Sequence, residues 1–173
     1  MSTPSIDDLV VNIADVTETP FQDGEFVNGP YKKLTPALEP RMGKLGANIT
    51  RLPPGKIGCP FHAHMVADEV FFVLSGRGVL RYGDEVKEIR AGDCISCPAA
   101  TGVAHQLANP FDEDLVYLAV GMNDPNEVCI YPDSGKIMID SLNRVGFLQD
   151  AEYMAGEPAT PKVFEMVKPR SHP

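Results

Sequence analysis

The sequence predicts an all-β protein, either a β-sandwich or a β-barrel. Turn-forming residues are frequent, with 15 glycines and 16 prolines among 173 residues. About eight short strand candidates follow one another between residues 47 and 121, and no amphipathic helix interrupts them. Closely spaced short strands separated by glycine and proline turns are typical of these two architectures.

The strand candidates follow from hydrophobic alternation bounded by turn residues. In chain order they cover residues 47–52, 61–64, 69–74, 79–82, 85–89, 94–97, 103–107 and 115–120. Pro53-Pro54-Gly55 ends the first of them, and Gly83-Asp84 joins two into a hairpin. Further on, residues 128–131 and 136–139 flank a Pro-Asp-Ser-Gly turn and form another predicted hairpin.

These elements divide the chain into three parts. Residues 1–44 form an N-terminal arm, with an edge strand expected near 10–13 or a helical turn near 6–11. Residues 45–121 form the barrel core. Residues 122–173 add the hairpin, a short helix expected at 142–153, and a proline-rich tail that we expect to pack on the barrel or on a partner subunit.

Charge and composition limit the partners. The formal net charge is −9, which disfavours nucleic acid or an anionic membrane as the main partner. The first 16 residues have neither a basic region nor a long apolar run, so we expect no signal peptide, no membrane anchor and a cytoplasmic location.

The four cysteines are expected to be free thiols in that location. Cys94 and Cys97 form a CxxC pair, but the surrounding residues resemble a strand. Residues three apart on a strand face opposite sides and cannot share a metal ion. We therefore expect these thiols to act as small buried hydrophobic groups.

The strand candidate at 69–74 is apolar on both faces after Glu69. Residues 69, 71 and 73 can line the barrel interior, so the face formed by residues 70, 72 and 74 must be covered by other groups. The cover could be the N-terminal arm, the C-terminal hairpin or a second subunit. We expect a homodimer, because self-association often covers apolar sheet faces.

Three histidines and one glutamate are the candidate metal ligands in this sequence. Two of the four histidines, His62 and His64, are one residue apart, and a strand would place both imidazoles on one face. Glu69 follows after an odd spacing, so residues 65–68 must turn if Glu69 is to point back toward them. His105 must then come from a distant strand. Histidine with carboxylate is a donor set that divalent transition metals prefer.

This stretch resembles the first motif of the cupin superfamily, which is a glycine, HxH, a glutamate and a second glycine. In this sequence the motif falls on Gly55, His62, His64, Glu69 and Gly76. The gap between the first glycine and the first histidine is one residue longer than usual. The resemblance covers roughly residues 45–121.

The second cupin motif also has a counterpart, at Gly92, Pro98, Gly102, His105 and Asn109. Three residues separate Pro98 from Gly102 where the family has one, which lengthens the turn before His105. The resemblance implies a double-stranded β-helix, or jelly roll, with extra N-terminal strands and a C-terminal hairpin and tail.

The resemblance also implies that His62, His64, Glu69 and His105 are metal ligands. Family members carry zinc, manganese, iron, nickel or copper, so the ion is not identified. Three neutral histidines and one carboxylate leave a divalent ion with net charge +1 and, if it is six-coordinate, two open positions. Such an ion can polarise a carbonyl group or activate dioxygen.

These observations predict a metal-dependent enzyme that acts on a small oxygenated metabolite. Isomerase-like chemistry on a sugar, sugar phosphate or keto acid is favoured, because residues 129–136 are similar to small bacterial cupins labelled sugar-phosphate isomerase-like. A dioxygenase, a decarboxylase and a lyase are alternatives. A non-catalytic cupin that binds a metabolite or a metal is the alternative from another class. The catalytic acid and base are not indicated by the sequence.

Overall fold

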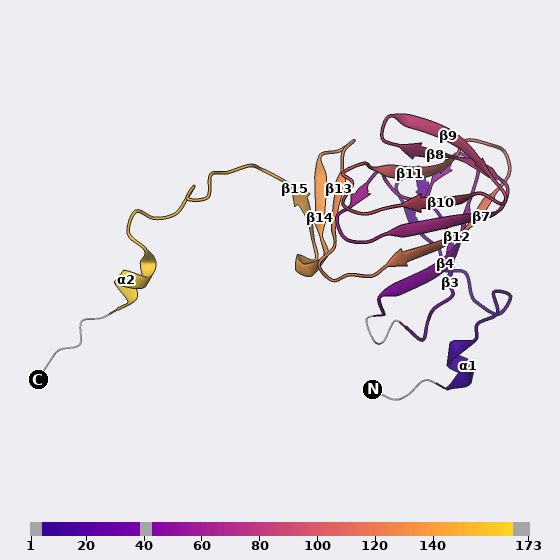
Figure 1. Ribbon diagram of the computed structural model, residues 1–173, viewed down its shortest axis with the longest axis horizontal. Helices are drawn as coiled ribbons and strands as arrows, with labels where there is room; N and C mark the ends of the chain where they lie inside the picture. The colour runs from indigo at the N-terminus through magenta and orange to yellow at the C-terminus, as the bar shows by residue number, and fades with distance from the viewer. Residues whose placement is uncertain (1–4, 39–42, 168–173) are drawn as a thin grey trace, which may run out of the picture.

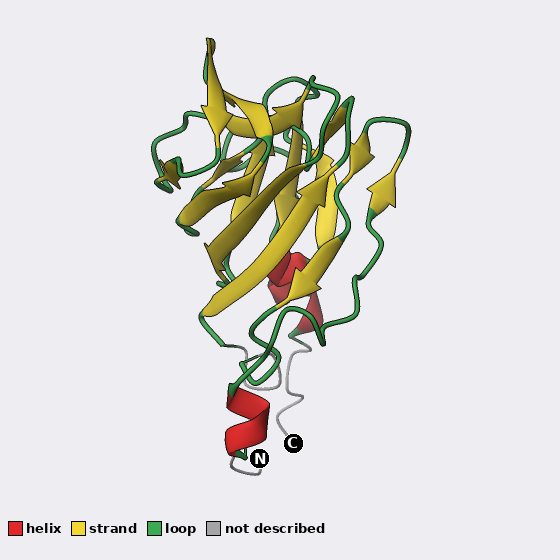
Figure 2. Cartoon of the chain, turned by 90° about the vertical axis from the view of Figure 1, so that its right-hand side faces the viewer, coloured by secondary structure: helices red, strands yellow, loops and turns green. Residues whose placement is uncertain are grey.

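The computed structural model describes residues 5–38 and 43–167. Within these ranges the regular secondary structure is almost entirely β-strand, as predicted (Figure 1). The expected double-stranded β-helix is confirmed as a jelly roll in which two large sheets face each other and a smaller sheet extends one end (Figure 2).

The first large sheet has five strands in the order β10-β7-β12-β4-β3. Its strands are β10 (Cys94–Cys97), β7 (Glu69–Ser75), β12 (Leu115–Met122), β4 (Leu45–Leu52) and β3 (Tyr31–Lys33). All neighbouring pairs in it are antiparallel.

The second large sheet has six strands in the order β1-β2-β5-β11-β8-β9. Its strands are β1 (Gln22–Asp23), β2 (Val27–Asn28), β5 (Lys56–Ile57), β11 (His105–Asn109), β8 (Arg77–Tyr82) and β9 (Glu85–Arg90). The hairpin predicted around Gly83-Asp84 is confirmed as the β8–β9 pair.

The small sheet has the order β15-β14-β13-β6. Its strands are β15 (Arg144–Phe147), β14 (Lys136–Ile139), β13 (Val128–Tyr131) and β6 (Ala63–His64). The predicted hairpin is thus confirmed at β13–β14 with the expected bounds. Through β13 it pairs with the short strand that carries His64.

The main core lies between the two large sheets. Its buried members are Leu52, Phe71, Val73, Ile89, Ile95, Cys97, Leu107, Leu115 and Tyr117. They come from six strands of both sheets, so the alternating inward residues of each strand build one shared core.

Strand β7 shows the predicted alternation. Phe71 and Val73 are buried, whereas Val70, Phe72 and Leu74 on the other face are 38, 39 and 45 % exposed. Each side chain takes the face that its parity along the strand dictates. The outward face therefore presents apolar side chains to solvent in the single chain.

The loop between β7 and β8 turns tightly at Gly76. Its φ angle is +75°, and a Cβ at this position would lie 2.1 Å from the carbonyl oxygen of Asp114. Only glycine fits both conditions without a backbone shift. This explains physically why the first motif ends in a glycine.

Two expectations for the ends of the chain were wrong. Residues 10–13 form no strand, whereas the alternative expectation, a helical turn near residues 6–11, is confirmed as α1 (Ile6–Leu9). The N-terminal strands are β1, β2 and β3. The helix expected at 142–153 is replaced by a 3₁₀ turn (Asp140–Leu142) followed by strand β15. The open edge of β14 offers hydrogen-bond partners to β15, and this pairing outweighs the local helical pattern.

After β15 the chain leaves the sheets as an extended arm that carries the short helix α2 (Lys162–Met166) (Figure 1). Residues 148–167 are exposed throughout. None of the helices in the described ranges is long and apolar enough to span a membrane.

Candidate metal centre

The four predicted site residues come together at one end of the jelly roll, where the three sheets meet. His64 ends β6, Glu69 begins β7 and His105 begins β11, one strand from each sheet. His62 lies just before β6 and is held by two backbone hydrogen bonds with His105, of 3.2 and 2.8 Å. Glu69 opens a new strand after the loop 65–68, as its odd spacing from His64 required.

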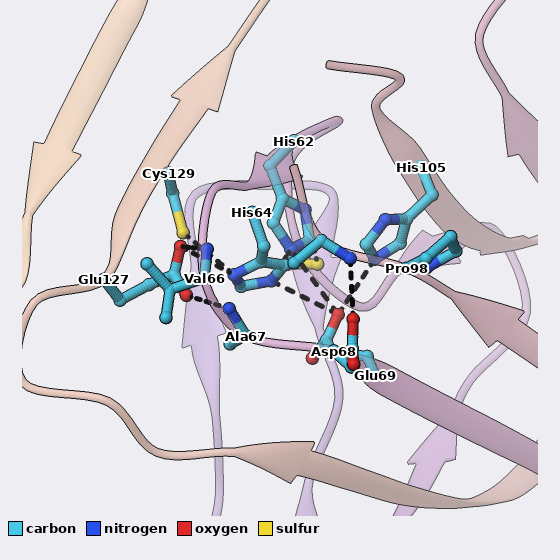
Figure 3. A network of polar contacts seen from close by, with 12 residues as sticks. His62, His64, Val66, Ala67, Asp68, Glu69, Pro98, His105, Glu127 and Cys129 are labelled. Carbon is cyan, nitrogen blue, oxygen red and sulfur yellow. Dashed lines mark hydrogen bonds and ion pairs between the residues drawn. The ribbon is translucent and has the colours of Figure 1, made fainter. Parts of the chain in front are cut away.

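The donor atoms of these side chains converge on one point, within 4.8 Å of one another (Figure 3). The Nε2 atoms of His62 and His64 are 3.0 Å apart. The Oε2 atom of Glu69 lies 2.9 Å from Nε2 of His105 and 3.2 Å from Nε2 of His64. It lies 4.0 Å from Nε2 of His62.

These separations fit a single metal ion. Two ligand atoms that are each about 2.1 Å from an ion are about 3.0 Å apart at a right angle and about 4.2 Å apart on opposite sides. The three short separations match the right-angle case, and the fourth approaches the opposite one. The donor set, three imidazoles and one carboxylate, suits zinc, iron, nickel or manganese.

The orientation of His62 is fixed by a backbone acceptor. Its Nδ1 lies 2.8 Å from the carbonyl oxygen of Pro60. Because a carbonyl oxygen can only accept, Nδ1 carries a proton and donates it. In the neutral ring Nε2 is then a bare lone pair that faces His64, as a metal ligand requires.

The pKa values of the two histidines also indicate that Nε2 of His62 is an unprotonated nitrogen. Burial lowers the pKa of His62 to about 4, so this ring is neutral at pH 7. Burial also disfavours the charged form of His64, but its hydrogen-bond partners Cys129 and Glu69 outweigh burial and raise the pKa of His64 to about 10. Two bare lone pairs 3.0 Å apart would repel, so a proton on His64 or a cation must lie between the rings.

Glu69 supplies the negative charge of the cluster. Burial alone would raise its pKa, but hydrogen bonds from His105 and His64 lower it to about 2. The carboxylate is therefore ionised at any physiological pH. A buried carboxylate facing three imidazoles is a site where a cation is stabilised.

The structure adds residues that sequence reasoning did not single out. The carboxylate of Glu127 is 4 % exposed, and it lies behind His64 together with the thiol of Cys129 (Figure 3). Glu127 belongs to neither motif and lies 58 residues after Glu69, so no local pattern marks it. Its only sequence signal is an acid directly before an apolar strand, which is common on protein surfaces.

The cysteine expectations are confirmed except for Cys94, which was expected to be buried and is exposed. All four cysteines are free thiols. Cys94 is exposed and Cys97 is buried, so the CxxC residues lie on opposite faces of β10. Cys59 lies beside the candidate site, with Sγ 3.5 Å from Nδ1 of His62, and burial raises the pKa of its thiol to about 12.

An open cavity of about 490 Å³ reaches His64. It is lined by Gly43, His64, Ala67, Met122, Asn123, Asp124, Pro125, Glu127, Cys129, Met138 and Asp140. Three of these residues are acidic, and no lysine or arginine belongs to this lining.

Part of the chain is similar to a known protein family and to one curated protein. Residues 48–121 match the family described as the cupin domain. A curated oxalate-binding protein of Thermotoga maritima is 34 % identical over 70 residues, which cover 40 % of this chain and 55 % of that protein. The chain thus spans about half the length of this curated relative.

Two solved structures share the architecture over most of the chain. A candidate sugar phosphate isomerase of Acidithiobacillus ferrooxidans has a TM-score of 0.75 at 23 % identity, covering 90 % of this chain and 99 % of that one. A sugar phosphate isomerase from a cupin superfamily, from Silicibacter pomeroyi, has a TM-score of 0.65 at 25 % identity, covering 87 and 96 %.

The fold and the cluster together define a jelly-roll protein with a site that could hold a divalent metal ion. The match to the cupin domain lies at residues 48–121, the part of the chain that contains strands of both large sheets and all four candidate ligands.

Proposed function

We propose that the chain binds one divalent transition metal ion through His62, His64, Glu69 and His105 and acts on a small oxygenated metabolite. The observation that carries this proposal is the convergence of three imidazole nitrogens and one ionised carboxylate on a single point. Such an ion supplies Lewis acidity, which polarises a carbonyl oxygen of a bound substrate.

Residues of the chain set the tautomer of His62, the charge of the centre and the access to one side of it. The Pro60 carbonyl holds His62 in the tautomer whose Nε2 faces the cluster. Glu69 lowers the positive charge of the centre by one. The phenol ring of Tyr131 stacks beside His62 with ring centroids 6.0 Å apart, and it restricts that side of the site.

Isomerase-like chemistry on a sugar or keto acid is the reaction that we favour. It is supported by the Silicibacter pomeroyi protein, whose fold this chain shares at 25 % identity. The acidic lining of the cavity beside His64 offers no cation to a phosphate group, and it favours a substrate that presents hydroxyl groups. An unphosphorylated substrate is therefore our preferred class.

A second candidate is non-catalytic binding of a small dicarboxylate. The oxalate-binding protein of Thermotoga maritima supports it, since it is 34 % identical over 70 residues. A centre with net charge +1 would attract an anion directly. Decarboxylase, lyase and dioxygenase activities belong to the same metal-dependent class and are tested with the same protein.

The test begins with the metal itself. Elemental analysis of purified protein should find about one transition metal ion per chain, and a chelator should remove it. The variant His62→Ala should lose stoichiometric binding, whereas His172→Ala, the same change at a histidine that belongs to neither sequence motif, should keep it. An unchanged stoichiometry in His62→Ala would contradict the ligand assignment.

Turnover then separates the two candidates. Protein reloaded with its native metal is incubated with unphosphorylated aldoses, with their phosphates and with oxalate. Isomerisation of a free sugar supports the favoured reaction. Saturable oxalate binding without turnover of any of these compounds would replace it with the binding function.

A further inference from the structure

The loop between His64 and Glu69 controls the distance between two of the proposed ligands. The Met65 N–H group still donates to the carbonyl oxygen of Val128 (3.0 Å), but residues 66–68 leave the regular strand pairing, so their backbone N–H groups need other acceptors. An unsatisfied buried N–H group is costly, and a loop with several of them would not stay in one conformation. Something outside the loop must therefore accept these hydrogen bonds.

That acceptor is Glu127. Its Oε1 atom accepts hydrogen bonds from the backbone N–H groups of Met65 (2.8 Å) and Val66 (3.3 Å), and Oε2 accepts one from Ala67. The N–H group of Val128 adds a fourth, of 3.0 Å. The carboxylate is buried, and Figure 3 shows it beside Val66 and Ala67, on the far side of His64 from Glu69.

This bonding pattern separates Glu127 from the ligands. Together with His64 and Cys129 it could be taken for a second metal site, because their donor atoms lie close together. Both of its oxygens, however, already accept backbone hydrogen bonds. A metal ion there would have to displace them and release the loop. The carboxylate is placed to hold the loop.

Glu127 and Cys129 also face the rear nitrogen of His64. Nδ1 of His64 lies 3.3 Å from Sγ of Cys129 and 3.6 Å from Oε1 of Glu127. A carboxylate and a thiol on this side favour a proton on Nδ1, which leaves Nε2 free to face Glu69 and His62. Partners of this kind orient histidine ligands and increase their affinity for a metal ion.

The far end of the loop is held separately. Oδ1 of Asp68 accepts a hydrogen bond of 2.8 Å from the backbone N–H of Ala99, and the Asp68 carbonyl accepts one of 3.1 Å from Met122. The end next to His64 is held by Glu127 and by one backbone hydrogen bond, from Met65 to the carbonyl oxygen of Val128. Loss of Glu127 should therefore loosen His64 more than Glu69.

We propose that Glu127 and Cys129 form a positioning pair that clamps the loop 65–67 and fixes His64 as a metal ligand through Nε2. This inference rests on the proposed function, since it assumes that the four-residue cluster binds a metal ion. It assigns a role to two residues outside the cupin motifs, and neither residue touches the ion.

The test compares Co²⁺ affinity in matched variants of the full chain. Glu127→Gln keeps the size of the side chain but replaces one acceptor oxygen with an amide that cannot accept. Glu113→Gln makes the same change at an exposed acid, whose side chain is 59 % exposed. Competition with a chelator measures affinity, and visible absorption reports the coordination of Co²⁺.

The expected result is a loss of affinity of roughly 10- to 100-fold in Glu127→Gln, with an altered Co²⁺ spectrum, and no change in Glu113→Gln. Affinity within about twofold of the parent protein would overturn the role of Glu127 and leave the proposed function intact. Failure of the parent protein itself to bind Co²⁺ would instead remove the proposed function, and this inference with it.

Cys129 provides a second, independent test, which also applies if Glu127→Gln does not fold. Cys129→Ser keeps an acceptor for Nδ1 of His64, whereas Cys129→Ala removes it. We expect Ser to bind Co²⁺ more tightly than Ala, and equal affinities would contradict the role of Cys129. In Zn²⁺-loaded parent protein, nitrogen-15 spectra of His64 should show a protonated Nδ1; a protonated Nε2 would overturn the clamp.

Discussion

Metal binding by this cluster should release about one proton per chain at neutral pH. The perturbation is the addition of Zn²⁺ to metal-free protein. A metal ion binds only the neutral imidazole and the ionised carboxylate, so each ligand that is protonated beforehand must lose its proton. The number released is therefore set by the pKa values of the metal-free site.

Those pKa values single out His64. Its pKa is raised to about 10, so the ring is protonated at pH 7 and must lose that proton. His62, with a pKa lowered to about 4, and Glu69, with a pKa lowered to about 2, are already in their binding forms. The expected release is thus about one proton, and it comes from His64.

The assay is isothermal titration calorimetry at one pH in buffers with different ionisation enthalpies. The observed enthalpy, plotted against the ionisation enthalpy, gives the number of protons released as its slope. The apparent affinity should also rise about tenfold for each pH unit between pH 7 and 9, because the proton that competes for His64 becomes scarcer toward its pKa.

Glu69→Gln is the companion variant. It removes the carboxylate that helps to keep His64 protonated, so both the affinity and the proton release should fall. A slope near zero in the parent protein, together with tight binding that is independent of pH, would refute the reasoning. It would mean that His64 is neutral before the metal arrives.

The remaining predictions concern stability and assembly. Gly76→Ala should destabilise the fold by about 2 kcal/mol or more and lower the melting temperature by roughly 4–8 °C, because of its φ of +75° and the close carbonyl of Asp114. Gly55→Ala, at φ +72° with nothing within 4 Å of its Cβ, should cost less, and equal costs in thermal melts would rule out the clash. Zn²⁺ at a hundred times its dissociation constant should stabilise the chain by about 2.7 kcal/mol, seen as a higher melting temperature that His62→Ala lacks. We propose that the apolar outer face of β7 packs in a homodimer, so light scattering should give about twice 18.8 kDa for the parent protein and the monomer mass for Phe72→Glu. Val86→Glu, which changes an exposed valine on β9, should leave the mass unchanged, and a monomeric parent protein would end the dimer proposal.

Strand parity explains why so much of the barrel could be predicted. The period of two along β7 buries Phe71 and Val73 and exposes Phe72, as alternation alone required. The same parity placed Cys94 and Cys97 on opposite faces of β10. Where strands are bounded by glycine and proline turns, local residues carry enough information to locate them.

The ends of the chain show the limit of local patterns. Residues 142–153 have a helical pattern, yet Arg144–Phe147 pairs with β14 because that strand has an open edge. The short strands β1 and β2 have only two residues each, and they exist because β5 and each other supply hydrogen-bond partners. A local sequence pattern cannot predict a strand whose hydrogen-bond partner is brought close only by folding.

The sequence by itself indicated three of the candidate site residues, because His62, His64 and Glu69 are close in the chain and their spacing requires a turn before β7, and the resemblance to the second cupin motif added His105. Only the tertiary structure decided how the site is supported. The Pro60 carbonyl sets the tautomer of His62, and the carboxylate of Glu127 accepts hydrogen bonds from the backbone N–H groups of residues 65–67. Glu127 is 58 residues from Glu69 in sequence. Hydrogen bonds depend on positions in space, so a partner this distant leaves no periodic trace in the chain.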